Sequence, residues 1–183
     1  MASDRSTSSV YVPAIISRTV HLDIASTGAD VSAVLGERVA GEIEGRCIVE
    51  GFVRPGSVEI HSFSAGVLEA DRVVFEVAVS CDVCSPVEGE RIECVARNVT
   101  KAGVRADVAS DPSPVMIFLA RDHHHRSKAF SEVEVGDVLN VQVIGQRFEL
   151  NDPYVSVIAS LEPAAHKRAL PRIAIGEEVG EVG

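Results

Sequence analysis

Cysteine and histidine are the residue types in this 183-residue chain that best suit metal or redox chemistry. Cys81 and Cys84 form a CxxC pair, which is the spacing that begins many zinc sites. Further ligands would have to come from Cys47, Cys94 or the run His123-His124-His125. No second CxxC is present, and the residues around Cys81 alternate like the end of a strand. The pattern therefore favours four unligated thiols over a zinc site, and no metal site is expected.

The histidine run lies in a polar, basic stretch, residues 120–131. Adjacent side chains rarely aim at one ion, so the run predicts a loop with partial positive charge near pH 6. The chain has no paired carboxylates, nucleophile elbow or phosphate-binding glycine loop. We therefore expect no catalytic residue and no cofactor.

The composition predicts a packed, β-rich protein. Hydrophobic residues make up 46% of the chain and aromatic residues only 4%, so valine, isoleucine, leucine and alanine must fill the core. The formal net charge of −10 argues against a protein that binds DNA by itself, although it allows a local basic groove. No secretory signal or membrane-length apolar run is apparent, so an intracellular, reducing compartment is expected.

The first half predicts one helix packed on an antiparallel sheet. Residues 1–9 lack periodicity and predict a disordered arm, whereas residues 20–24 alternate like a strand. Asp30 precedes a run with helical spacing and can cap its amino end. Three further strands are predicted at residues 45–53, 58–63 and 73–81. We expect an α+β domain over residues 10–84.

The second half predicts an all-β domain over residues 85–162. Five apolar or alternating segments are separated by turn signals, with a longer insertion between the third and the fourth. This is the outline of a five-stranded OB barrel. Residues 163–183 lose periodicity and end in an acidic, glycine-rich stretch, which predicts a tail.

Several segments of the second half resemble the S-one class of OB domains. Residues 89–104 are similar to the opening hairpin of that class, with Gly103 where the chain bends. Residues 117–123 resemble its third strand with the turn that follows, and residues 135–152 resemble its fourth strand and hairpin.

A narrower resemblance spans residues 10–161. Residues 42–53, the Ser-Ala-Gly-Val-Leu run at 64–68 and residues 143–161 are similar to segments of the RNA polymerase stalk family, which comprises the seventh subunit of the eukaryotic enzyme and its archaeal counterpart. In that family the 64–68 run is a glycine-rich hairpin loop. The long amino-terminal arm, the short 112–131 region and the tail depart from the family pattern. A polymerase of a large DNA virus would fit these departures.

The resemblance implies a non-catalytic polymerase subunit. The first domain, called the tip, would dock on the polymerase core near the clamp, and both domains would hold a small helical stalk partner. The docking residues would be Phe63, Ser64, Ala65, Gly66 and Val67, although an ordinary tight turn with Phe63 folded onto its own sheet weighs equally. The protein would lie in the nucleus if eukaryotic, or in a cytoplasmic virus factory or virion if viral, without membrane contact.

The second domain would contact nascent single-stranded RNA. The candidate RNA-binding residues are Lys101, Arg105, Phe118, Arg121, His123 and Arg147. Phe118 would serve either as a stacking platform or as a core residue, and the core is favoured. For any one of the basic residues among them, a solvated surface charge is favoured over a phosphate contact. Binding is therefore expected to be weak, sequence-tolerant and strongly salt-dependent.

Two other functions fit parts of the sequence. The S-one features alone suggest a free-standing RNA-binding protein in RNA processing or translation. The histidine and cysteine residues suggest an enzyme with a metal site in a β-rich fold. The acidic charge and the scarcity of aromatic residues argue against the first.

Overall fold

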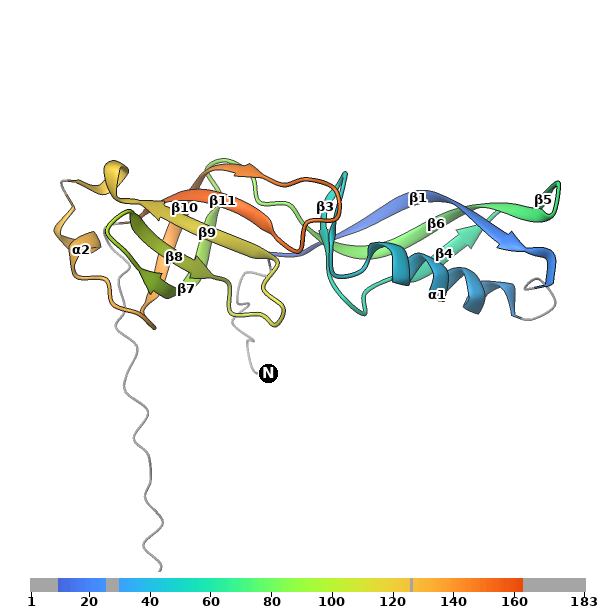
Figure 1. Ribbon diagram of the computed structural model, residues 1–183, viewed down its shortest axis with the longest axis horizontal. Coiled ribbons are helices and arrows are strands. Elements are labelled where there is room, and N and C mark those ends of the chain that lie inside the picture. The colour runs from blue at the N-terminus through green and yellow to red at the C-terminus, as the bar shows by residue number, and fades with distance from the viewer. Residues whose placement is uncertain (1–9, 26–29, 126, 163–183) are drawn as a thin grey trace, which may run out of the picture.

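The computed structural model describes residues 10–25, 30–125 and 127–162. It has two parts lying end to end (Figure 1): an N-terminal antiparallel sheet with one helix, and a closed, five-stranded barrel consistent with an OB fold. This is the predicted fold class. We call the first part the tip and the second the barrel. The predicted arm and tail lie outside the described residues.

One long strand, β6 (Arg72–Cys84), is the spine of the tip. Along one side it pairs with β1 (Val12–Asp23) over the whole length of β1. Its other side pairs in turn with three short strands: β3 (Gly51–Val53), β4 (Glu59–Phe63) and β5 (Val67–Glu69). A further strand, β2 (Cys47–Ile48), pairs with β3. The sheet is therefore long and narrow.

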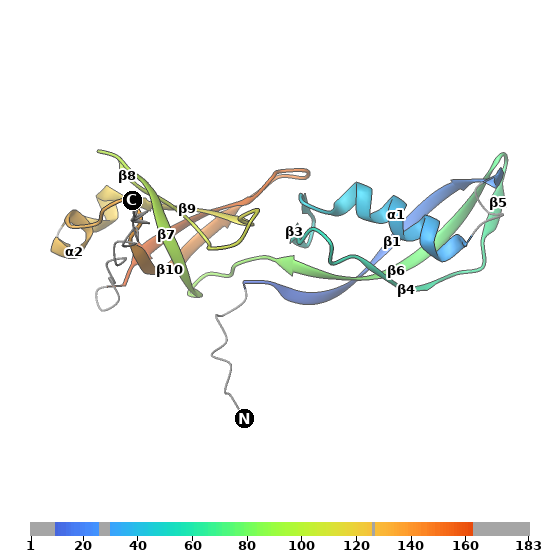
Figure 2. The same cartoon turned by 90° about the horizontal axis from the view of Figure 1, so that it is seen from below.

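Helix α1 (Val31–Ile43) covers one face of this sheet, as Figure 2 shows. Leu35, Val39 and Ile43 recur on one side of the helix and are buried. Asp30 caps it as predicted, since its carboxylate accepts hydrogen bonds from Ser32 N at 3.1 Å and Ala33 N at 3.4 Å. Along β1 and β6 alternate side chains point toward α1 and are buried, so the opposite face of the sheet carries the more exposed residues.

The prediction of one strand over residues 45–53 is wrong. The segment folds back on itself, so that Cys47 of β2 lies opposite Phe52 of β3. Gly51 permits the reversal because its φ of 136° is a conformation that other residues rarely adopt. A Cβ atom at Gly51 would also lie 2.5 Å from the carbonyl oxygen of Cys84.

The predicted hairpin loop at residues 64–68 is also wrong. β4 and β5 both run along β6, so residues 64–66 form a bend within one edge of the sheet. The chain reverses farther on, between β5 and β6, where Ala70 adopts a φ of 55°.

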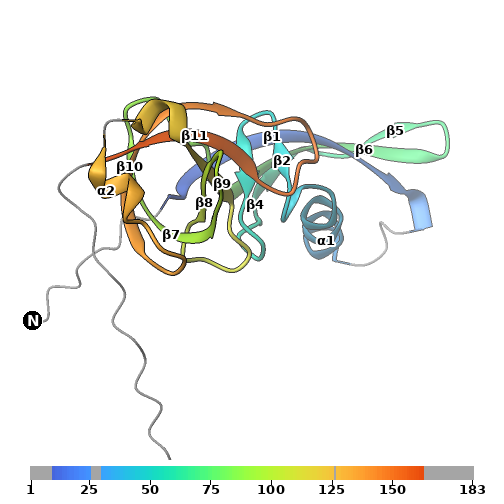
Figure 3. The same ribbon diagram turned by 60° about the vertical axis from the view of Figure 1, so that its left-hand side comes forward.

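The barrel closes in the order β10-β11-β9-β8-β7, with β10 pairing back to β7 (Figure 3). Its strands are β7 (Arg91–Val99), β8 (Gly103–Asp107), β9 (Val115–Ala120), β10 (Val138–Arg147) and β11 (Val155–Leu161). β11 and β9 are parallel, and the other pairs are antiparallel. The insertion after β9 contains a 3-10 turn, η2 (Arg121–His124), and a short helix, α2 (Lys128–Ser131).

The tip and the barrel share a core where they meet. Cys47, Phe52 and Cys84 belong to the tip sheet by pairing, yet they are buried in the hydrophobic cluster of the barrel. Cys47 N donates to Asp152 O, and Asn151 N donates to Cys47 O, both at 2.8 Å. These two bonds join β2 to the turn between β10 and β11. The division after Cys84 into separate domains stays a prediction.

Tyr11 completes the junction on the side of β1. Its side chain packs against the barrel cluster, and the Arg54 guanidinium lies 5.4 Å from the centre of its ring. Burial raises the pKa of the Tyr11 hydroxyl from 10.0 to about 12, and the nearby Cys84 adds to the increase.

Candidate nucleic-acid and protein interfaces

A row of outward-facing side chains crosses the barrel. The strand register places Asn98 of β7 beside Arg105 of β8, and Arg105 beside Phe118 of β9. Phe118 in turn lies beside Ile158 of β11. Phe118 is 36% exposed and Ile158 is 48% exposed. We call these four residues the outer row. It places an aromatic ring, a guanidinium and an aliphatic side chain together on one surface, which is a combination suited to stacking bases.

The favoured interpretation of Phe118 as a core residue is wrong. Along β9 the buried side chains are those of Val115, Ile117 and Leu119, so Phe118 points to the outside. Its ring leans over Gly103, where an added Cβ would lie 3.0 Å from the end of the ring and 2.2 Å from Leu119 O. The geometry is that of an exposed platform resting on the backbone of β8.

The positive charge of the outer row is partly compensated. The Asp107 carboxylate lies 3.6 Å from Arg97 Nε and 4.0 Å from Arg105 Nε. Both arginine side chains remain more than half exposed. Because Arg97 and Arg105 share the single carboxylate of Asp107, the three side chains together keep a modest net positive charge. RNA binding at this surface would therefore be weak.

Arg121 and Lys101 come together at the end of the β7–β8 hairpin. Arg121 Nε donates to Lys101 O at 2.8 Å, and Arg121 Nη2 donates to Thr100 O at 3.2 Å. The Arg121 guanidinium also lies 5.5 Å from the centre of the Phe130 ring. With Val99 and Thr100, these two basic residues line a shallow hollow of about 690 Å³. Arg121 therefore uses two of its N–H groups to hold the β7–β8 hairpin, and fewer remain for a phosphate.

The prediction of a charged loop for the histidine run is wrong for His124. This residue is only 7% exposed, and its ring stacks on Phe130 with 4.5 Å between the ring centres. Leu161 N donates to its Nε2 at 2.8 Å, and its Nδ1 lies 2.7 Å from Ala120 O. These partners require a proton on Nδ1 and a lone pair on Nε2, which is a neutral tautomer. His124 therefore joins η2 to the end of β11.

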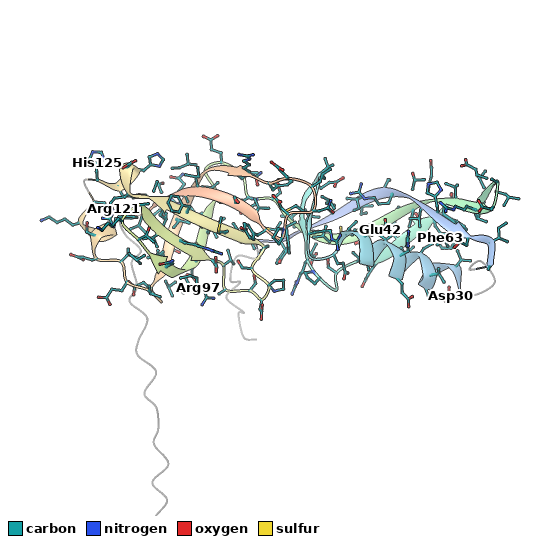
Figure 4. The ribbon with its side chains drawn as sticks, in the orientation of Figure 1. Asp30, Glu42, Phe63, Arg97, Arg121 and His125 are labelled. Atoms are coloured by element: carbon teal, nitrogen blue, oxygen red, sulfur yellow. The ribbon has the colours of Figure 1, made fainter. Side chains whose placement is uncertain are left out.

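Besides Lys101 and Arg121, two further predicted RNA-binding residues lie apart from the outer row. His123 is exposed on η2, which follows β9. Arg147 is at the opposite end of the barrel, where β10 ends near the tip, and its Nη2 lies 3.1 Å from a Glu149 oxygen. Figure 4 shows Arg97, Arg121 and His125 on the barrel, with Phe63 in the other half of the molecule.

Three exposed apolar residues, Phe63, Val67 and Leu68, lie on the β4–β5 edge of the tip, and we call them the distal patch. The register places Phe63 and Leu68 on one face of this edge and Val67 on the other, so the patch wraps around the edge of the sheet. Phe63 is 43% exposed, and its ring meets Phe75 edge to face, with centroids 6.2 Å apart. Val67 and Leu68 are 60% and 65% exposed. Phe63 thus packs partly on its own sheet and remains partly available to a partner.

The rest of the predicted docking segment, residues 64–66, is held against the sheet. Ser64 N donates to Glu76 O at 2.9 Å, and Glu76 N donates to Ser64 Oγ at 3.0 Å. A Cβ at Gly66 would lie 2.4 Å from a methyl carbon of Val73, so only glycine fits there without movement. Phe63 and Val67, on either side of the bend, therefore remain exposed to a partner. Ala65 is also exposed, between Ser64 and Gly66.

The four cysteines are buried free thiols. Burial raises the pKa of Cys47 to about 11 and those of Cys84 and Cys94 to about 12, and it also raises the pKa of Cys81. Such thiols are poor nucleophiles at neutral pH. Within residues 10–25, 30–125 and 127–162, no three His, Cys, Asp or Glu side chains are grouped to hold a metal ion.

Sequence reasoning missed three residues on these surfaces: Asn98, Ile158 and Leu68. A signal for Ile158 was present, since Val155, Val157 and Ala159 alternate inward and leave Ile158 as an apolar residue facing out. Asn98 follows a register shift in β7, and Leu68 faces out on a short edge strand. Neither of these positions has a comparable signal in the sequence.

No known protein family matches this chain, and a comparison with curated proteins gives no match either. No helix in the described part of the chain is long and apolar enough to cross a membrane.

Proposed function

We propose that this chain is a non-catalytic subunit of a DNA-directed RNA polymerase. It forms the stalk with a small helical partner subunit and contacts nascent single-stranded RNA near the exit path. The tip docks on the polymerase core near the clamp, and the barrel projects beside the RNA. The proposal combines the two-part fold with the sequence resemblance over residues 10–161.

The observation that carries the proposal is the junction. A stalk must hold an RNA-binding domain at a set distance from its docking site, which requires the two parts to move as one body. The shared core at Cys47, Phe52 and Cys84 and the two backbone bonds to Asn151 and Asp152 provide such a connection. A barrel attached by a flexible linker would not support this role.

The surfaces are distributed as a stalk would need. The distal patch is in the tip, and the outer row is on the barrel, so protein docking and RNA contact would not compete. The net charge of −10 is compatible with a protein whose main affinity is for other proteins.

Affinity purification of the tagged chain from its native source, with mass spectrometry of the co-purified proteins, tests the proposal. We expect the large polymerase subunits and a small helical partner. Recovery of RNA or ribosomal proteins without polymerase would overturn it.

Two substitutions separate the two surfaces in the same experiment. Phe63→Asp places a charge in the distal patch and is expected to reduce polymerase recovery about tenfold or more, without unfolding the chain. Phe118→Ala is expected to leave polymerase recovery unchanged and to reduce crosslinking to RNA. Equal polymerase recovery with Phe63→Asp and the unchanged chain would remove the distal patch from the docking site.

The runner-up is a free-standing RNA-binding protein. The outward orientation of Phe118 beside Arg105 favours it, since this platform would serve RNA binding outside a polymerase as well. RNA binding by the purified chain at physiological salt with a dissociation constant below about 10 nM would favour this function over the stalk.

A further inference from the structure

The free edge of β1 is an unusual feature of the tip. β1 pairs with β6 from Val12 to Asp23 without a bulge, and no strand of the described chain pairs with its other edge. Long free edges are normally protected by prolines, charged residues or bulges, because their backbone groups can pair with another chain. The only proline in β1 is Pro13, at its beginning, and among residues 19–23 only Asp23, at the end, carries a formal charge. This part of the edge therefore has little such protection.

A groove of about 630 Å³ runs along these residues. All five consecutive residues from Thr19 to Asp23 line it. Successive side chains of a strand point to opposite faces, so a cavity lined by five in a row follows the edge of the strand. The facing wall is α1, through Val34, Glu37, Arg38 and Glu42, and Figure 4 labels Glu42 beside β1. We call this cavity the β1–α1 groove.

The charges of the groove leave one carboxylate uncompensated. Arg38 Nε lies 2.9 Å from a Glu42 oxygen, and Arg72 Nε lies 3.9 Å from an Asp23 oxygen. Glu37 is exposed and forms no ion pair with any residue that the structure describes. The wall formed by α1 therefore attracts a cation.

We propose that the β1–α1 groove binds an extended segment of another protein, which adds to the sheet as a strand beside β1. Its backbone pairs with the free edge at residues 19–23. A basic side chain of the segment meets Glu37, and an apolar side chain two residues away, on the same face, contacts Val34. The two side chains would be about 6.6 Å apart along the strand, which suits neighbouring positions on one face of a helix.

Charge argues against a nucleic acid as the occupant. The groove holds the carboxylates of Asp23, Glu37 and Glu42 against the guanidinium groups of Arg38 and Arg72, and this excess of negative charge would repel phosphates. Binding of a strand here uses only the edge, the groove and the charges of the tip, so it is independent of any role in a polymerase.

Amide hydrogen exchange of the full chain, followed by NMR, tests the binding mode. The probe is the peptide acetyl-Thr-Val-Thr-Lys-Thr-Val-Thr-amide, which has valine and lysine at alternate positions, added at about 1 mM. We expect exchange of at least two amides within residues 19–23 to slow about tenfold. Protection confined to other strands, or none at any site, would overturn the proposal.

Two altered peptides test the backbone contact. One is N-methylated at the odd positions and the other at the even positions, and only one set of amides can face β1. We expect one of the two to lose binding. If both bind as well as the parent peptide, the segment does not add as a strand.

A matched pair of variants tests the charge contact. Glu37→Lys is expected to weaken binding about tenfold, whereas Glu59→Lys, on the exposed surface of β4, is expected to leave it unchanged. An equal effect of both variants would show that only the overall charge matters, which would contradict the assigned site.

Discussion

The tip and the barrel bury the apolar face of a β-sheet in different ways. The barrel closes on itself, so every strand has two neighbours and the inward side chains of Ile117, Leu119 and Leu139 are fully buried. The tip is an open sheet with a helix on one face, and β1 keeps a free edge. Consequently the barrel can offer only outward side chains to a partner, whereas the tip also offers backbone groups.

Under the proposed function, this difference would assign the two kinds of recognition to different parts of the molecule. Side chains such as Phe118 and Arg105, held on a closed surface, suit the stacking and charge contacts that RNA needs. An open edge and an apolar patch suit contacts with other proteins. If the comparison is correct, the substitutions that cost the most stability should remove contacts inside the closed barrel, and loss of contacts on the open tip should cost less.

The largest effect is expected at His124. His124→Ala removes a buried ring and leaves Leu161 N and Ala120 O without partners, which should lower the free energy of unfolding by about 3 kcal/mol. In the tip, Arg18→Ala removes the ion pair with Glu50 at 3.2 Å, and a loss below about 1 kcal/mol is expected. Urea denaturation measures both. Similar losses for the two variants would contradict the comparison.

A pair of glycines gives a second contrast. Gly103→Ala in the barrel would place a Cβ 2.2 Å from Leu119 O, a backbone atom held by strand pairing, and should cost about 3 kcal/mol. Gly66→Ala in the tip meets side-chain atoms of Val73 and Phe75, which can move, and about 1 kcal/mol is expected. Denaturation curves of both variants measure the loss in free energy of unfolding. A greater loss for Gly66→Ala than for Gly103→Ala would contradict the comparison.

Alkaline pH tests whether the two parts unfold together. Cys84 at the junction and Cys94 in the barrel have pKa values raised from 9.0 to about 12 by burial. The folded protein keeps these protons while the unfolded chain releases them above pH 9. The free energy of unfolding should therefore fall between pH 9 and 12, by up to about 1.4 kcal/mol per pH unit for each thiol.

The controls for this pH dependence are Cys84→Ala and Cys94→Ala. Each substitution removes one titrating thiol, so the free energy of unfolding should fall less steeply with pH, by up to about 1.4 kcal/mol per pH unit. A single unfolding transition is expected for both variants. Two separate transitions, with only one of them sensitive to Cys84, would show that the tip and the barrel unfold independently.

The smallest change in stability is expected for exposed aromatic residues, where function should respond instead. Phe118→Ala should change the free energy of unfolding by less than about 1 kcal/mol and weaken binding of fluorescent oligo-uridine at low salt about tenfold. Phe63→Ala should leave this RNA affinity unchanged. Fluorescence anisotropy at several salt concentrations makes the comparison, and equal RNA affinities for the two variants would remove the outer row from the RNA site.

The sequence predicted the elements whose signals are local. Alternation of Val73, Phe75, Val77 and Val79 indicated β6, and Asp30 indicated the start of α1. Five alternating or apolar segments with one insertion indicated the barrel. Each of these patterns reflects a periodicity or a cap within a few residues, which makes it readable without tertiary structure.

The sequence predictions are wrong where contacts between residues distant in the sequence determine the structure. All five residues from Val115 to Leu119 are apolar, so only pairing with β8 and β11 reveals that Phe118 points out. His124 is buried by a contact with Leu161, 37 residues away. The family resemblance predicts a hairpin loop at residues 64–68, and this is wrong because a glycine-containing break has the same sequence pattern whether the chain reverses or continues along β6.

The backbone bonds of Cys47 to Asn151 and Asp152 have a mechanical consequence. Bending the molecule at its middle would require breaking both bonds and opening the core around Phe52 at the same time. With these contacts in place, the tip and the barrel would turn together as a lever arm. A small rotation imposed where the distal patch is held would swing the outer row through an arc set by the length of the whole molecule.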